Sequence, residues 1–486
     1  MVIDSKGDLL KSQNQIEIDA RDLRKFGYMQ ELLRDMGGFS NFAISFSVIS
    51  ILTGAIQLYG YGLSHGGPLQ ITLGWLVVSA FTLMVGLAMA ELASAYPTAG
   101  ALYHWSYFLG GRTFGWFTAC FNMIGQFAIL AGVDYGLALY LIGLLGISNT
   151  PFNAFGIYFI LLFSHALLNH IGIRLVSWLN DFSAWYHIAV VILLIGLLAW
   201  KGFSQPITFL GHFHSSDGFP PTYSFLVGLL LAGWTLTGYD ASAHVTEETV
   251  DPRRRAPWGI FLAIVVSSVA GFFMLASVTL AIPNLDQAIA FGDNAFIEIL
   301  KLRLGSLAIL PMGLIAGAMW LCGVACMTSA SRMLYAFARD GGLPFSSFWA
   351  RISPSYRTPS NAIWGLSLFA TILAFSVSLY SAVVSIATIA LAISYGLPIL
   401  AKLLAWKKTG TTERGPWHLG KWSRVVAVIA LVWICFIAVV FVLPPNTQAG
   451  WGLLICSGIL TCLWILVVRE RFAGPSYRLA PGGVAV

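Results

Sequence analysis

Long apolar segments recur along almost the whole of this 486-residue chain, and only 10% of its residues are charged. A bilayer has a hydrocarbon core about 30 Å thick, which a helix of about 20 apolar residues crosses. In lipid every backbone polar group needs a partner within the protein, so such segments fold as helices. The sequence therefore predicts an all-α integral membrane protein. Twelve spans are expected, at residues 39–63, 68–93, 114–145, 153–171, 182–200, 222–247, 257–282, 306–335, 361–379, 381–404, 424–443 and 450–468.

The basic residues predict how these helices are oriented. Loops on the cytoplasmic side of membrane proteins carry an excess of Lys and Arg. If both termini are cytoplasmic, 24 of the 27 Lys and Arg residues lie on that side, and the exceptions are Lys201, Lys301 and Arg303. We therefore expect both termini in the cytoplasm. The plasma membrane is the expected location, and an internal membrane is the alternative. The net charge of +6 follows from basic loops that would contact anionic membrane lipids, and no nucleic-acid partner is predicted.

The segments between the spans are too short to form a soluble domain. The first 38 residues are polar and lack the apolar core and cleavage site of a secretory signal. Residues 284–304 have an amphipathic helical pattern and would form an outer lid or an interfacial helix. The six cysteines lie in or beside apolar spans, which predicts neither a disulfide framework nor a metal site. Without a phosphate loop or a catalytic spacing of ligands, neither an enzyme nor a cofactor is predicted.

The tripeptide Leu-Thr-Gly occurs twice inside apolar spans, at residues 52–54 and 236–238. A spanning helix is interrupted only where the freed backbone groups line a cavity. Paired interruptions at corresponding positions of two halves are typical of secondary transporters. We therefore predict helix breaks at Gly54 and Gly238, although glycine and threonine are common in membrane helices and the match alone is a weak signal.

Three ionisable residues inside predicted spans stand out, Asp134, His187 and Asp240. A charge at membrane depth costs roughly 3 kcal/mol or more and marks a functional site. Asp240 follows the second break and would bind a proton, cap the next half-helix, or both. Asp134 would hold a substrate ammonium, relay protons, or form a buried hydrogen bond that fixes helix packing. His187, expected within one turn of the cytoplasmic end of its span, would respond to protons or be an interfacial residue.

The breaks would themselves supply ligands. A half-helix that starts beyond Gly54 presents N–H groups and a positive dipole end to a carboxylate. Carbonyl groups near Thr53 and Thr237 would instead accept an ammonium group or a coupling cation. Trp234 lies one turn before Gly238, where it would act as an aromatic gate or a cation–π platform. Plain packing is the alternative, since the chain has 17 tryptophans.

Charged residues near the cytoplasmic ends of spans are candidates for an inner gate. Glu91, Glu247 and Glu248 would pair with arginines such as Arg332 or Arg339. Exposed ion pairs contribute about 0 to 1 kcal/mol, so these pairs would bias a conformational equilibrium only weakly. Simple interfacial charges are the alternative.

Three stretches carry a resemblance to a known superfamily. They are residues 91–103 (ELASAYPTAGALY), 238–248 (GYDASAHVTEE) and 331–344 (SRMLYAFARDGGLP). In these stretches the chain resembles the amino acid, polyamine and organocation transporters, and it is most similar to their amino acid and choline transporter family. That family includes permeases for 4-aminobutyrate (GABA) and for choline. The similarity runs from about Gly27 to the last span.

The resemblance implies the leucine-transporter fold, in which substrate lies between two broken helices. Spans one to five and six to ten would form inverted repeats, and the last two spans would be appended. The expected divisions are a cytoplasmic tail (1–38), a transport core (39–404) with repeats at about 39–200 and 222–404, the appended spans (424–468) and a cytoplasmic C-terminal tail (469–486).

The resemblance also implies roles for single residues. Relatives hold a substrate carboxylate on the backbone of a Gly-Ser-Gly-like turn, which Thr53, Gly54 and Ala55 match here. The first glycine of that turn is missing, which weakens the carboxylate site and keeps choline as a possible substrate. Trp234 and Asp240 match the gating aromatic residue and the acidic residue that follows the second break.

We predict a secondary active transporter that moves a small amino acid or amine, such as GABA, by alternating access. Proton symport is favoured over sodium coupling. His187 would stand in for a lysine of proton-coupled relatives, and Ser329 lies where sodium-coupled relatives place a hydroxyl ligand. A choline, ethanolamine or polyamine permease, a gradient-independent exchanger, and a non-transporting nutrient receptor are the alternatives. The sequence does not define the oligomeric state.

The predicted site residues fall into three groups. The substrate site comprises Thr53, Gly54, Ala55, Gln57, Asp134, Trp234, Thr237, Gly238, Tyr239 and Asp240. Proton or ion coupling would involve Asp240, Asp134, His187 and Ser329. Gating would involve Trp234, Glu91, Glu247, Glu248, Arg332 and Arg339.

Overall fold

The computed structural model describes residues 5–374, 380–410 and 412–475. In these ranges the regular secondary structure is helical, and an isolated β-bridge joins Met36 to Thr249. Ten of the described helices are long and apolar enough to cross a membrane. The prediction of an all-α membrane protein is therefore confirmed, whereas the count of twelve spans stays a prediction.

The sixth and ninth predicted spans do not meet this length criterion. The sixth is divided into the short helices α10 (Pro221–Gly228), α11 (Leu230–Thr235) and α12 (Ala241–His244). The ninth corresponds to α18 (Ser360–Ala374), and its predicted end at 375–379 lies outside the described residues.

The other helices follow the predicted order. The first span comprises three helices, α2 (Gly38–Ile49), α3 (Ile51–Gln57) and α4 (Tyr59–Leu69). The remaining long helices are α5 (Trp75–Ala95), α7 (Arg112–Leu145), α8 (Pro151–Ile171), α9 (Ile173–Lys201), α13 (Pro252–Leu280), α16 (Ile309–Arg339), α19 (Tyr380–Thr409), α20 (Ser423–Val440) and α21 (Thr447–Leu463). The shorter ones are α1 (Ser5–Lys25), α6 (Leu102–Gly110), α14 (Leu285–Ala290), α15 (Ala295–Leu304), α17 (Ser346–Trp349) and α22 (Arg469–Arg471).

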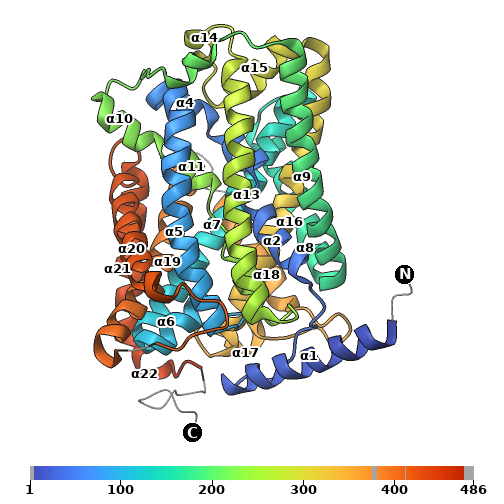
Figure 1. The fold of residues 1–486 in the computed structure, drawn as a ribbon, viewed down its shortest axis with the longest axis vertical. Coiled ribbons are helices and arrows are strands. Elements are labelled where there is room, and N and C mark those ends of the chain that lie inside the picture. Colours follow the sequence, from blue (N-terminus) through green and yellow to red (C-terminus); the bar gives the residue numbers. More distant parts are fainter. Residues whose placement is uncertain (1–4, 375–379, 411, 476–486) are drawn as a thin grey trace.

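The long helices lie side by side along the vertical axis of Figure 1. Helices α1, α6, α17 and α22 lie at one end of this bundle, and α14 and α15 lie at the other (Figure 1). We call the first the inner end, which is the predicted cytoplasmic side, and the second the outer end. Large apolar side chains such as Trp185, Ile192, Trp451 and Leu454 are exposed on α9 and α21, as expected of a surface that contacts lipid.

The first helix break lies at Ser50, so the predicted break at Gly54 is wrong. Ser50 has φ 23° and ψ 86° and separates α2 from α3, whereas Gly54 lies within α3. Gly54 serves a different purpose, because a Cβ atom there would lie 2.8 Å from the Cα of Thr235. The glycine therefore allows close contact between α3 and α11, which belong to the two broken spans.

The second break lies where the sequence predicts it. Helix α11 ends at Thr235, α12 begins at Ala241, and Gly238 between them has φ 100°. A positive φ of this size is accessible to glycine at little cost, which explains why this break has a clear sequence signal and the break at Ser50 has none.

Two further expectations have clear outcomes. Residues 284–304 form α14 and α15, whose residues Phe296 and Leu300 are fully buried, so the predicted apolar face is confirmed. Helix α9 begins at Ile173 rather than near residue 182, which places His187 near the middle of the helix. The prediction that His187 lies at the cytoplasmic end of its span is therefore wrong.

Candidate functional site

A small cavity lies between the two helix breaks. Its volume is about 10 Å³, which corresponds to roughly one water molecule. Thr53 and Gly54 line it from α3, Trp234 and Thr237 from the second broken span, and Cys322 from α16, with apolar residues of α2 and α7 between them. An amino acid does not fit in this volume, so the structure shows the site in a closed form.

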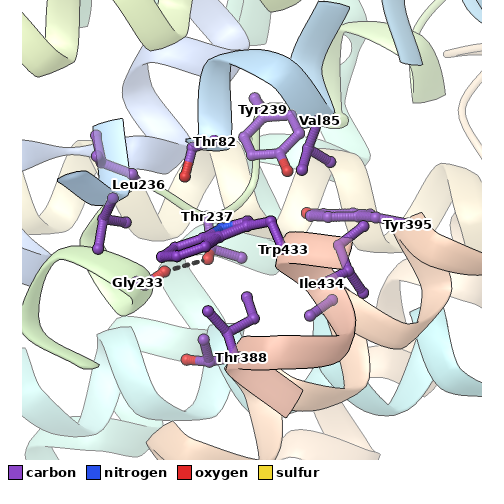
Figure 2. Close-up of a pocket in the computed structure, with 13 residues that line it drawn as sticks. Thr82, Val85, Gly233, Leu236, Thr237, Tyr239, Thr388, Tyr395, Trp433 and Ile434 are labelled. Atoms are coloured by element: carbon purple, nitrogen blue, oxygen red, sulfur yellow. Dashed lines mark hydrogen bonds between the residues drawn. The ribbon is translucent and has the colours of Figure 1, made fainter. Parts of the chain in front are cut away.

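A second cavity, of about 30 Å³, lies beside the second break, on another side of it (Figure 2). Thr237 lines both cavities, and its hydroxyl donates a hydrogen bond to the carbonyl of Gly233 at 2.5 Å. Trp433 of α20 extends across this cavity, and Tyr239 and Tyr395 lie beside it (Figure 2). The unwound segment around Thr237 therefore has space on two sides.

His187 contacts the first break directly. Its Nε2 lies 2.8 Å from the Ser50 hydroxyl, which in turn lies 2.7 Å from the hydroxyl of Thr53. Its Nδ1 lies 2.8 Å from the carbonyl of Ser183 and must carry the proton of that hydrogen bond. The neutral ring therefore accepts a hydrogen bond from Ser50 at Nε2, so the charge of His187 and the hydrogen bonding of the break depend on each other.

Asp240 is the centre of a buried polar network at the second break. Its Oδ1 accepts a hydrogen bond from the Tyr395 hydroxyl at 2.8 Å, and its Oδ2 lies 3.2 Å from Nε2 of His244. Two amides of α7, Asn122 and Gln126, also donate to Oδ2, at 3.2 and 3.1 Å. The network reaches Ser329, which accepts a hydrogen bond from Gln126 at 3.2 Å. The structure thus links Ser329 to Asp240 through the amide of Gln126.

Trp234 closes the small cavity between the breaks on the side that faces the outer end. Its indole N–H donates to Oε1 of Gln57 at 3.1 Å, and a Cβ atom at Gly132 would lie 3.3 Å from its ring. Gln57 also lines an outer cavity of about 440 Å³ that extends to Asp293 and Asn294 at the outer end. Trp234 and Gln57 therefore separate a wide outer vestibule from the small cavity at the breaks.

Asp134 pairs with a buried histidine of a neighbouring helix. Its Oδ2 lies 3.1 Å from Nδ1 of His165 on α8, and both side chains are fully buried. A Cβ atom at Gly323 would lie 2.4 Å from Oδ1 of Asp134, so α16 approaches this pair closely through a glycine. Asp134 is not among the residues that line the cavity between the breaks. Its predicted roles in substrate binding and proton coupling stay predictions.

Two bidentate ion pairs cross the inner end of the molecule. Arg332 donates to both carboxylate oxygens of Glu248 at 3.0 Å, and Arg339 donates to both of Glu247 at 2.9 Å. The predicted pairing is confirmed, but these pairs are not exposed, because Glu247, Glu248 and Arg332 have no accessible surface. Opening a buried pair leaves charges without partners and costs far more than opening an exposed pair.

Glu91 does not join these arginines. Its carboxylate lies 2.6 Å from Nζ of Lys402 and 2.5 Å from the hydroxyl of Ser423. The expected pairing of Glu91 with Arg332 or Arg339 is therefore wrong, because the fold places Glu91 of α5 against α19 and α20 instead.

The segment between α1 and α2 covers the inner end. The Tyr28 hydroxyl donates to Asp340 at 2.8 Å, and the guanidinium of Arg339 lies 4.0 Å from the centre of the Tyr28 ring. Arg34 donates to the carbonyls of Thr246 and Thr249, next to the buried glutamates. Burial and the nearby Asp340 raise the pKa of Tyr28 well above its usual value, so this hydroxyl stays a donor. The inner end is therefore closed by several layers.

Sequence reasoning did not find several of these residues. His244 lies one turn after Asp240, a spacing that puts the two side chains on one helix face, so this signal was available. Ser50, Tyr395 and Lys402 had no such local signal, since each contacts a titratable side chain from a distant part of the chain, His187, Asp240 and Glu91 respectively.

These features define a class of protein: a helical membrane protein with two broken spans around a small polar site, which is the arrangement of a transporter. Residues 36–466 match the family described as amino acid permease. The chain is 37% identical to amino-acid permease BAT1 of Arabidopsis thaliana, over 93% of this chain and 95% of that protein. It is 38% identical to the BAT1 homolog of Oryza sativa, over 93% and 94%.

A more distant relative is a GABA-specific permease of Saccharomyces cerevisiae, at 29% identity over 91% of this chain and 81% of that protein. The chain belongs to the amino acid permease family, within the superfamily that its motifs resemble. Members of this family are transporters and not enzymes. The substrates of this chain are accordingly small molecules of the amino acid class.

Proposed function

We propose that this permease carries a small amino acid, with GABA as the first candidate, by alternating access coupled to protons. The observation that supports this most directly is that a titratable side chain lies at each helix break. His187 contacts Ser50 at the first break, and Asp240 follows Gly238 at the second. The GABA-specific relative supports the choice of the first candidate.

The proposed architecture is the leucine-transporter fold. Its twelve spans comprise inverted repeats at about 39–200 and 222–404, followed by two further spans at 424–468, with both termini in the cytoplasm and the protein in the plasma membrane. In this arrangement the breaks at Ser50 and Gly238 each lie in the first span of a repeat. The two breaks thus occupy equivalent positions in the two proposed repeats, which supports the proposal.

The proposed substrate site uses the backbone of both breaks. The first turn of α3 presents N–H groups toward Ser50, where a helix lacks its own acceptors. Thr53 and Gly54 already donate to the Ser50 carbonyl at 2.8 and 3.0 Å, so we place the substrate carboxylate one turn nearer Ser50 than the sequence suggested. Carbonyls near Thr237 would accept the ammonium group. Among the described residues, those that line the cavity between the breaks include no acidic side chain, which favours a zwitterion over a choline-like cation.

Protonation of His187 would act on this site through Ser50. The neutral ring accepts a hydrogen bond from the Ser50 hydroxyl, and a protonated ring donates one instead. The Ser50 proton is then free to point toward Thr53 or toward a bound carboxylate. A proton on His187 therefore favours an anionic ligand at the first break, which is the thermodynamic requirement for symport.

Uptake into proteoliposomes tests this function. Radiolabelled GABA, choline and a mixed set of amino acids are supplied with and without an inward proton gradient. We expect GABA or another small amino acid to accumulate only with the gradient. Saturable flux that ignores the gradient and requires internal substrate would show an exchanger, and accumulation of choline alone would show an amine permease.

A further inference from the structure

Both ring nitrogens of His244 face oxygen atoms. Nδ1 lies 3.1 Å from the carbonyl of Ala99, and Nε2 lies 3.2 Å from Oδ2 of Asp240. A carbonyl oxygen only accepts, so Nδ1 carries a proton. A hydrogen bond between Nε2 and Oδ2 needs a second proton, on either atom. The two side chains together therefore hold one proton more than a carboxylate beside a neutral histidine would hold.

The surroundings of the pair favour a carboxylate beside an imidazolium. The Tyr395 hydroxyl and the amides of Asn122 and Gln126 all donate to Asp240. Other titratable groups near it are Tyr239 and the Cys326 thiol of α16. From α2 the uncharged Asn41 and Ser45 contact Ser242 of α12, and Gly259 of α13 also lies close to Ser242. On the inner side Glu247, Glu248, Arg332 and Arg339 are paired with one another, and His104 is bonded to Asp340.

The backbone of Ala99 links the Asp240–His244 pair to the ion pairs that close the inner end. Its carbonyl accepts from His244, and its N–H donates to Oε1 of Glu247 at 3.0 Å, the same oxygen that Arg339 contacts. If the extra proton leaves, His244 keeps one proton for two acceptors. Either the Ala99 contact or the Asp240 contact is then replaced by two facing lone pairs. The closed inner end therefore binds this proton more tightly than an open one.

We propose that the Asp240–His244 pair holds a coupling proton at the second break, besides the one that His187 would bind at the first, and that, through Ala99, this proton keeps the inner gate closed. The inference rests on the proposed proton-coupled function and assigns its proton to particular atoms. Opening of the gate separates Ala99 from His244, and the proton passes from His244 to inner water. Since linkage is reciprocal, a proton without substrate keeps the inner end closed and prevents a leak.

The native Cys322 offers a test of the gate. It lines the cavity at the breaks and is 1% exposed in the closed form, so a membrane-impermeant thiol reagent should reach it from the inner side only after opening. The variants are made in a background whose other cysteines are alanine. We measure the labelling rate in inverted vesicles between about pH 6 and 8, the range in which histidines titrate. Each rate is divided by that of a free thiol in the same buffer, because thiolate formation alone speeds labelling as the pH rises, and labelling below means this corrected rate. Gradient-driven uptake and substrate exchange are measured in proteoliposomes.

We expect labelling of the unaltered site to rise with pH, by up to about tenfold per pH unit, the limit for one linked proton. His244→Gln should make labelling independent of pH and should abolish gradient-driven accumulation while exchange remains. Exchange also shows that this variant is folded. Asp240→Asn, which removes the same proton differently, should likewise make labelling independent of pH. The matched control is His418→Gln, at an exposed histidine, which should behave as the parent.

Two outcomes separate the inference from the function on which it rests. If the parent accumulates substrate with the gradient and His244→Gln keeps both this accumulation and the pH dependence of labelling, the assignment of the proton to this pair is overturned. If the parent itself ignores the gradient, the proton-coupled function fails instead.

Discussion

Gly54 and Gly238 both follow a Leu-Thr pair in the sequence and have different roles in the structure. Gly238 adopts φ 100° and interrupts its helix, whereas Gly54 stays helical and lets α3 approach Thr235. The sequence predicts the break at Gly238 because a positive φ favours glycine. It does not predict the break at Ser50, because a serine with φ 23° is held there by tertiary contacts, including the one with His187.

Gly54→Ala should disrupt the contact between the two broken spans. The added Cβ would lie 2.8 Å from the Cα of Thr235, so one backbone must move, and such overpacking costs about 1 to 3 kcal/mol. We expect a lower melting temperature of the purified protein and a loss of uptake. Gly196→Ala is the control, since nothing lies within 4 Å of its added Cβ. Equal uptake by the two variants would contradict this account of Gly54.

Asp240→Asn should uncouple transport without unfolding the protein. The amide has the shape of the carboxylate and still accepts hydrogen bonds, for example from Tyr395, but it cannot share a proton with His244. We expect exchange of substrate to persist and accumulation driven by a proton gradient to disappear, as measured by uptake into proteoliposomes. Normal accumulation by this variant would remove Asp240 from the coupling mechanism.

At the scale of elements, the inner end is closed by contacts between α16 and the unwound segment after α12. The sequence correctly predicts the partners Glu247, Glu248, Arg332 and Arg339, because all four lie near the same ends of their spans. It does not predict that the pairs are buried, since burial depends on the segment between α1 and α2 that covers them. Nor does it predict the partner of Glu91, because Lys402 lies in a helix distant in the sequence.

The buried pair Glu248–Arg332 should show strong energetic coupling. Removing one partner from a buried pair costs about 3 to 5 kcal/mol, because the other charge then lacks a partner, whereas replacing both is often nearly neutral. We expect Arg332→Met to lower the melting temperature far more than the double variant Glu248→Met and Arg332→Met. A double variant as unstable as the sum of the single variants would show that the two charges act independently.

At the scale of the whole molecule, the two ends of the transport path differ in how many groups close them. The inner end is closed by buried ion pairs and the segment before α2, whereas Trp234 and Gln57, joined by one hydrogen bond, lie between the outer vestibule and the cavity at the breaks. We infer that the outer gate opens with less rearrangement than the inner gate. The spacing of apolar segments predicts the membrane helices, but the closed form depends on contacts between distant helices and has no signature in the sequence.

The central claim is that protons move with the amino acid. The most direct measurement uses proteoliposomes that contain a pH-sensitive dye and are given the transported amino acid with no initial gradient and with the membrane potential clamped. Substrate entry should acidify the interior, and His187→Gln and His244→Gln should weaken or abolish this signal. Saturable entry of the amino acid with no change of internal pH would contradict the account.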